Sequence, residues 1–249
     1  MVVWLLLTFK DVLMFGKRFL IGLITLIAAF LPLSCFAIDD FEIIEESKVQ
    51  KRLNNVGARI LNSNKIDKRI VFAYDKQEVE GKLDTIKDKT LLNRQIAVYG
   101  YDYKFIEDDN ELAAYLSRHI AEAYRSYSGV FNGRLSSLKM KAAPKKYQIV
   151  FDKIAVDYMV KAGYNPIGMI TYINKSKDQK RTNSFTQNLA SKRLAIIYEY
   201  IYTKYPYYLK NNEYFHNVSY QNFLLTSQEN RRMLEEKIKS GSKEELKYE

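Results

Sequence analysis

The 249-residue sequence predicts an α+β fold that is mostly helical and carries a small antiparallel sheet. Several long segments place apolar residues at three- and four-residue spacing, which is typical of amphipathic helices. Two short segments, 69–75 and 94–106, alternate apolar and polar residues as half-buried strands do. With 47% hydrophobic and 27% charged residues, the chain has the composition of one sizeable globular domain.

A secretory signal peptide is predicted over residues 1–37. The basic pair Lys17 and Arg18 precedes an apolar stretch, and Cys35 and Ala37 stand at the −3 and −1 positions of a cleavage site. The alternative is an uncleaved N-terminal anchor, although the apolar run is shorter than the ~20 residues that a membrane span needs. We therefore expect export to the periplasm, cell envelope or extracellular space, with membrane contact only through an uncleaved N-terminal segment.

The remaining chain divides into a domain over 38–226 and a charged, helix-prone tail over 227–249, which we expect to be solvated at its end. Met14 is an alternative start. Residues 44–62 open the domain with helical spacing of Val49, Leu53, Val56 and Ile60.

Composition excludes several kinds of site. The formal net charge is +10, but the positive residues are scattered and no nucleic-acid motif is present, so no nucleic-acid partner is expected. One cysteine excludes an intramolecular disulfide and a multi-cysteine zinc site. The two histidines, His119 and His216, are too far apart for an H-E-x-x-H helix.

The most informative helix is predicted over 110–124, with Asp109 or Asn110 as its N-cap. Arg118, His119 and Glu122 lie on or beside its apolar face. Burial of charge without a partner is costly, so these groups require ion-pair partners, a metal or a wet cleft.

Further helices are predicted over 146–162, ending at Gly163, and over 189–203, with a short helix opening at Asn165-Pro166. A polar loop is expected over 176–186.

Three stretches share a further pattern, namely 108–123 (DDNELAAYLSRHIAEA), 147–166 (YQIVFDKIAVDYMVKAGYNP) and 184–206 (SFTQNLASKRLAIIYEYIYTKYP). In this order they resemble three segments of the HtpX/BepA-like gluzincins, the zinc metallopeptidases of family M forty-eight. Those segments are E-L-A-A followed by H-E-x-x-H, E-x-x-A-D followed by A-G-Y-D/N-P, and H-P-x-x-x-x-R-L. The resemblance implies a zincin-like (gluzincin) domain over about 45–225.

In the register of this resemblance, every metal-site position is changed. Arg118 and Glu122 stand at the two zinc-histidine positions, His119 stands at the general-base position, and Gln148 replaces the glutamate ligand. Asp152 matches the aspartate of the second motif. In the third motif Gln187 replaces the histidine, and Arg193 is retained.

These changes predict a pseudopeptidase with no cofactor. Arg118 has no lone pair for a metal, and a catalytic zinc needs three donor ligands. We expect the Arg118 guanidinium to bond Glu122 and Asp152 in the metal's place, and truncation of Arg118 to cost about 3–5 kcal/mol if the pair is buried. His119 is expected to be a core or cleft histidine rather than a catalytic one.

The predicted function is binding of polypeptide or of an envelope protein, or modulation of a partner, with residues 94–104 as the strand that a peptide would join. The alternative is an active zinc metalloendopeptidase with a rearranged site of His119, Glu122 and Asp152. A purely structural envelope protein is a third reading.

Overall fold

The computed structural model describes residues 45–76, 95–127, 144–179 and 184–248. The predicted signal peptide and the segment between the two predicted strands lie outside this part of the chain. Two compact units are distinguished, Met1–Val49 and Gln50–Glu249. The first is described only at its end, where Lys48 and Glu45 form an exposed ion pair. None of the described helices is both long and apolar enough to cross a membrane.

The second unit is α+β, mostly helical, with a two-stranded sheet among the described residues. Strands β1 (Val71–Asp75) and β2 (Gln95–Tyr99) run parallel, with Val71 opposite Gln95 and Asp75 opposite Tyr99. The predicted antiparallel sheet is therefore wrong. Parallel strands need a crossover of about a dozen residues or more, and the chain between β1 and β2 is long enough to provide one.

The second strand is also shorter than the predicted 94–106. At Gly100 the chain turns into the short helix α2 (Gly100–Tyr103). A Cβ atom at this position would lie 2.8 Å from the carbonyl oxygen of Lys76, so only glycine lets the two backbones approach so closely. The turn brings Asp102, a buried residue of α2, beside the end of β2.

The helix of residues 45–63 agrees with the prediction over 44–62. Leu53, Val56 and Ile60 are buried as its spacing predicts. A Cβ atom added to Gly57 would lie 2.1 Å from the ring of Phe72, so this helix packs closely against β1.

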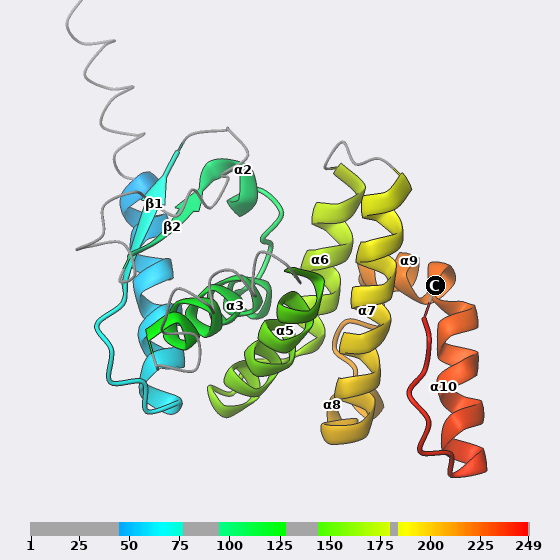
Figure 1. Ribbon diagram of the computed structural model, residues 1–249. Helices are drawn as coiled ribbons and strands as arrows, with labels where there is room; N and C mark the ends of the chain where they lie inside the picture. The colour runs from blue at the N-terminus through cyan, green and yellow to red at the C-terminus, as the bar shows by residue number, and fades with distance from the viewer. Residues whose placement is uncertain (1–44, 77–94, 128–143, 180–183, 249) are drawn as a thin grey trace, which may run out of the picture. The chain divides into compact units, whose positions relative to one another are not determined.

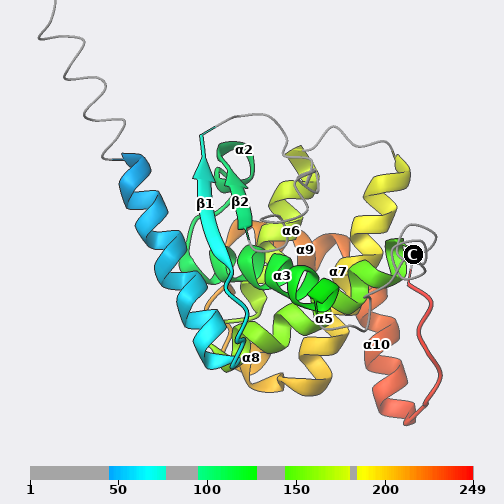
Figure 2. The same ribbon diagram turned by 60° about the vertical axis from the view of Figure 1, so that its left-hand side comes forward.

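The remaining described helices follow in chain order: α3 (Asp109–Tyr127), α5 (Pro144–Lys161), α6 (Ile167–Gln179), α7 (Ser184–Lys204), α8 (Pro206–Lys210), α9 (Val218–Thr226) and α10 (Gln228–Ser240). Helix α3 is the centre of the unit, because it packs against β2 on one side and against α5 and α6 on the other (Figure 1). Helix α6 in turn packs against α7 and α9, and α7 against α5, α8 and α10. Figure 2 shows the sheet on one side of α3 and the later helices on the other.

The predicted helix boundaries around Gly163 are confirmed. Gly163 has φ +75°, the left-handed conformation that ends a helix. The side chain of Asn165 then accepts a hydrogen bond from the N–H of Ile167 at 3.0 Å and so caps α6. The predicted loop over 176–186 is wrong at both ends, because α6 continues to Gln179 and α7 begins at Ser184.

The C-terminal tail forms helix α10, as its composition predicts, and then returns to α7. Tyr248 is buried and donates a hydrogen bond to Glu199 at 2.9 Å. Lys237 bonds the other carboxylate oxygen of Glu199, also at 2.9 Å. The end of the tail is thus attached to the folded unit at Tyr248 rather than solvated there.

Candidate functional site

Helix α3 begins one residue earlier than predicted. The N-cap is Asp108, whose side chain accepts a hydrogen bond from the N–H of Glu111 at 2.8 Å, and not Asp109 or Asn110. The Glu111 carboxylate is fully buried and pairs with Lys175 of α6 at 2.7 Å. This buried ion pair joins the first turn of α3 to α6.

Farther along α3, Arg118 reaches a carboxylate of α5. Its Nε atom lies 3.2 Å from Oδ1 of Asp152, and its Nη1 atom lies 3.8 Å from Glu122. The predicted bond of Arg118 to Asp152 is therefore confirmed, whereas Glu122 lies within ion-pair distance but beyond a hydrogen bond.

A second arginine completes the group. Arg193 of α7 donates from Nε to Oδ2 of Asp152 and from Nη2 to Oδ1 at 2.7 Å, so it binds the carboxylate with two parallel hydrogen bonds. We call Arg118, Asp152 and Arg193 the arginine–aspartate cluster. It joins α3, α5 and α7 at one point.

The cluster is largely removed from water. The Asp152 side chain is 1% exposed, whereas those of Arg118 and Arg193 are 20% and 21% exposed. Burial by itself lowers the pKa of the Arg193 guanidinium, but the charge and hydrogen bonds of Asp152 raise that pKa, and the net shift is upward. Arg193 therefore stays protonated.

The residues at this position do not fit a catalytic zinc ion. Arg118 offers no lone pair, Gln148 offers only a neutral amide, and both oxygens of Asp152 accept hydrogen bonds from guanidinium groups. Within the described ranges, no three His, Cys, Asp or Glu side chains are grouped so that they could hold a metal. The alternative set of His119, Glu122 and Asp152 therefore does not form such a group. Gln187 belongs to α7, and its side chain lies outside the described part.

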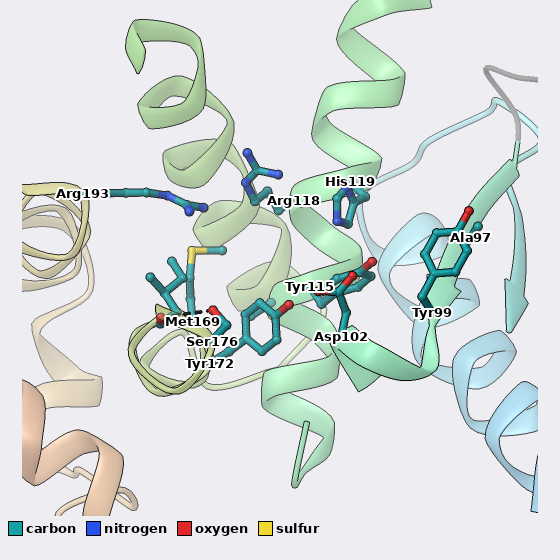
Figure 3. Close-up of a pocket in the computed structure, with 12 residues that line it drawn as sticks. Ala97, Tyr99, Asp102, Tyr115, Arg118, His119, Met169, Tyr172, Ser176 and Arg193 are labelled. Atoms are coloured by element: carbon teal, nitrogen blue, oxygen red, sulfur yellow. Dashed lines mark hydrogen bonds between the residues drawn. The ribbon is translucent and has the colours of Figure 1, made fainter. Parts of the chain in front are cut away.

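The two arginines of the cluster line one side of a cavity of about 200 Å³ between β2, α2, α3, α6 and α7 (Figure 3). Arg118 and His119 line it from α3, and Arg193 lines it from α7. The other lining residues are Ala97, Tyr99, Asp102, Ala114, Tyr115, Met169, Tyr172, Ile173 and Ser176. Three of the positions singled out from the sequence thus meet at one cavity.

His119 is nearly buried, as expected of a core or cleft histidine. Its ring packs edge-on against Tyr115, with centroids 4.4 Å apart and an interplanar angle of 61°. The imidazole also faces the cavity, where Figure 3 shows it between Arg118 and Tyr99.

Two tyrosine hydroxyls lie between groups of opposite charge. Burial raises the pKa of Tyr115 and of Tyr172 well above the ordinary value. The nearby carboxylate of Asp102 raises both pKa values further. The positive charge of Arg118 acts on both in the opposite direction. Both hydroxyls therefore remain protonated and can donate or accept hydrogen bonds at neutral pH.

Sequence reasoning missed the contribution of α6 and Asp102 to this cavity. Met169, Tyr172, Ile173 and Ser176 follow the i, i+3, i+4, i+7 pattern of one helix face, so their spacing was a signal that could have been used. No comparable local signal marks Asp102, because its position depends on the turn at Gly100.

Comparison of the chain with family models, curated proteins and solved structures finds no match.

Proposed function

We propose that this chain is an exported, non-catalytic polypeptide-binding protein built on the scaffold of a gluzincin peptidase. In this proposal the cavity beside β2 and α3 receives part of a polypeptide, such as an envelope protein or a partner whose activity is modulated. The arginine–aspartate cluster replaces the metal as the cross-link between the helices. No cofactor takes part.

The observation that carries the proposal is that one residue from each of the three motif segments joins a single ion-pair cluster, and that two of these residues line a cavity. Arg118, Asp152 and Arg193 belong to three separate stretches of the sequence and are joined by hydrogen bonds, and Arg118 and Arg193 line the cavity. The charged groups there are engaged with one another rather than with a set of metal donors. A site of this kind favours binding over hydrolysis, because no Lewis acid or activated water is provided by its residues.

The position of strand β2 at the cavity supports a polypeptide as the ligand. Ala97 and Tyr99, on one face of β2, line the cavity, whereas Ile96 and Val98 on the other face are buried. Helix α2 closes the end of this strand, so the strand available to a ligand is 95–99 and not the predicted 94–104. A ligand in the cavity therefore meets β2 at Ala97 and Tyr99.

The test uses the purified full-length chain in mild detergent with a pool of fluorescein-labelled hexapeptides of random sequence. We expect saturable binding, measured by fluorescence anisotropy, that is unchanged by EDTA or 1,10-phenanthroline, and peptides that remain intact by mass spectrometry. The variant Ser176→Leu, which fills the cavity from α6, is expected to reduce binding at least about tenfold.

The matched control is Ser240→Leu on α10. Each of these serine hydroxyls donates to the carbonyl oxygen three residues earlier in its own helix, at 3.1 Å for Ser176 and 3.0 Å for Ser240. Ser240 is exposed and does not line the cavity. This control should bind as the unaltered chain does. The proposal would be overturned if no peptide of the pool binds. It would also be overturned by peptide cleavage that requires zinc and stops when a chelator is added.

A further inference from the structure

The cavity has a positive and a negative side. Figure 3 shows Arg118 and Arg193 at one side and Asp102 with Tyr99 at the other. The pKa of the Tyr172 hydroxyl responds to both sides, since Asp102 raises it and the two arginines lower it. The space between them is therefore polarised.

The positive side retains hydrogen-bond donors. A guanidinium carries five N–H donors. The bonds to Asp152 engage Nε of Arg118, and Nε and Nη2 of Arg193. Among the described residues, these bonds leave other Nη donors of both arginines for a ligand at the cavity wall.

The charges of the cluster are unequal. Two guanidinium groups share one buried carboxylate, and Glu122 stands 3.8 Å from Arg118 with 38% of its side chain exposed. Uncompensated charge in a partly buried site is unfavourable, and an anion that enters from the cavity would offset it. Arginine pairs are well suited to a carboxylate, because their planar forks match its two oxygens.

The size of the cavity limits what can enter. Its volume of about 200 Å³ is below the ~300–1,000 Å³ of pockets that bury drug-sized ligands, and above the ~150 Å³ that holds a benzene molecule. It accommodates one end group or one side chain rather than an extended peptide.

We infer that the cavity binds a single carboxylate group of a polypeptide, held by Arg118 and Arg193. The hydroxyls of Tyr115 and Tyr172 lie beside this group. Asp102 stands at the opposite side of the cavity, where its carboxylate can accept hydrogen bonds from N–H groups of the ligand. This inference rests on the proposed function and specifies its ligand. The carboxylate has two sources, the C-terminus of a chain or the side chain of an aspartate or glutamate.

Four hexapeptides test the inference on the full-length chain, each labelled at its N-terminus with an uncharged BODIPY dye that carries no carboxylate, with affinities measured by anisotropy. They are a neutral sequence with a free C-terminus, the same sequence as its C-terminal amide, that amide with one internal glutamate, and that amide with one internal glutamine. We expect the free acid or the glutamate amide to bind at least about tenfold more tightly than the plain and glutamine amides, and the difference to shrink in high salt. Preference for the free acid assigns the C-terminus, and preference for the glutamate amide assigns the side chain.

The variant Arg118→Gln removes one of the two guanidinium groups that hold the ligand carboxylate, so it should remove most of this preference. The fold should be retained, because Asp152 keeps its two bonds from Arg193. Its matched control is Arg52→Gln, because Arg52 also bonds an aspartate, Asp109, at 2.6 Å and is 28% exposed, yet it does not line the cavity. The control should retain the full preference.

Equal affinities for all four peptides would overturn the inference, while binding that is still sensitive to Ser176→Leu would leave the proposed function intact. Absence of binding by every peptide would overturn both. The peptide comparison on the unaltered chain requires no variant, so it decides the question even if Arg118→Gln fails to fold.

Discussion

Replacement of Asp152 by asparagine removes the one negative charge on which the arginine–aspartate cluster depends. The carboxylate is 1% exposed and accepts hydrogen bonds from both Arg118 and Arg193. Asparagine has nearly the same size, but it offers one acceptor oxygen and places an NH₂ group against guanidinium donors. The two arginines then remain close together, with only the partly exposed Glu122, 3.8 Å from Arg118, as a counter-ion.

The cost follows from burial. Breaking a buried ion pair by removing one partner costs about 3–5 kcal/mol. Because the arginine side chains are 20% and 21% exposed, water reaches them in part, and we expect the lower end of that range, about 3 kcal/mol. For a unit of this size, 3 kcal/mol corresponds to a fall in Tm of ~6–12 °C.

The structure changes the expectation for Arg118→Ala. From the sequence, Arg118 was expected to be a main partner of Asp152, and its loss to cost about 3–5 kcal/mol. In the structure, Arg193 keeps two hydrogen bonds to the same carboxylate, so the loss should be only about 1–2 kcal/mol. Asp152→Asn must therefore be the more destabilising of the two.

The assay is thermal and urea unfolding of the full-length chain, followed by far-UV circular dichroism. The matched control is Asp157→Asn on the same helix. Asp157 also accepts several hydrogen bonds, including one from Tyr205 at 2.7 Å, but its side chain is 26% exposed, and we expect a loss of about 0.5–1 kcal/mol. A Tm for Asp152→Asn within 2 °C of the unaltered chain, or a larger loss for Arg118→Ala than for Asp152→Asn, would refute this reasoning about the cluster.

Two further predictions concern packing and pH. Gly57→Ala should destabilise the protein by about 1–3 kcal/mol or more in urea unfolding, because its Cβ atom would lie 2.1 Å from the Phe72 ring; an unchanged midpoint would contradict the close packing of that helix on β1. Burial raises the pKa of Tyr220 to about 12, above the ~10 of an unfolded tyrosine, so its contribution to stability is full below pH 10 and is lost as pH rises from 10 to 12. Tyr220→Phe should therefore lose less stability than the unaltered chain between pH 9 and 11.5 in melting experiments, and an identical loss would argue against the raised pKa.

Much of the helical structure could be predicted because helix formation is a local property. The spacing of Leu53, Val56 and Ile60 indicates one buried face, and all three are buried. Gly163 and Asn165 mark the boundary between α5 and α6 through their own backbone and side-chain preferences. The ion pairs of Arg118 were also predictable in part, from the need of a charged residue on an apolar helix for partners.

The orientation of the strands was not predictable in the same way. Alternation of residues in β1 and β2 indicates strands, but it is the same for parallel and antiparallel pairing. The direction is decided by the path of the connection and by what covers the sheet. Likewise the N-cap at Asp108 depends on where the preceding turn places a carboxylate, since three polar residues in a row, 108–110, offer the same chemistry.

The sequence by itself thus determined where the main helices lie, that one of them ends at Gly163, and that Arg118 needs ion-pair partners. Only the tertiary structure decided that Arg193, which is 41 residues from Asp152 along the chain, is the closer of the two arginine partners. The same holds for the cavity, whose walls come from a strand and four helices that are brought together by packing. The physical reason is that periodicity and capping act within a few residues. The identity of side chains that meet across helices depends on how whole buried faces fit against one another.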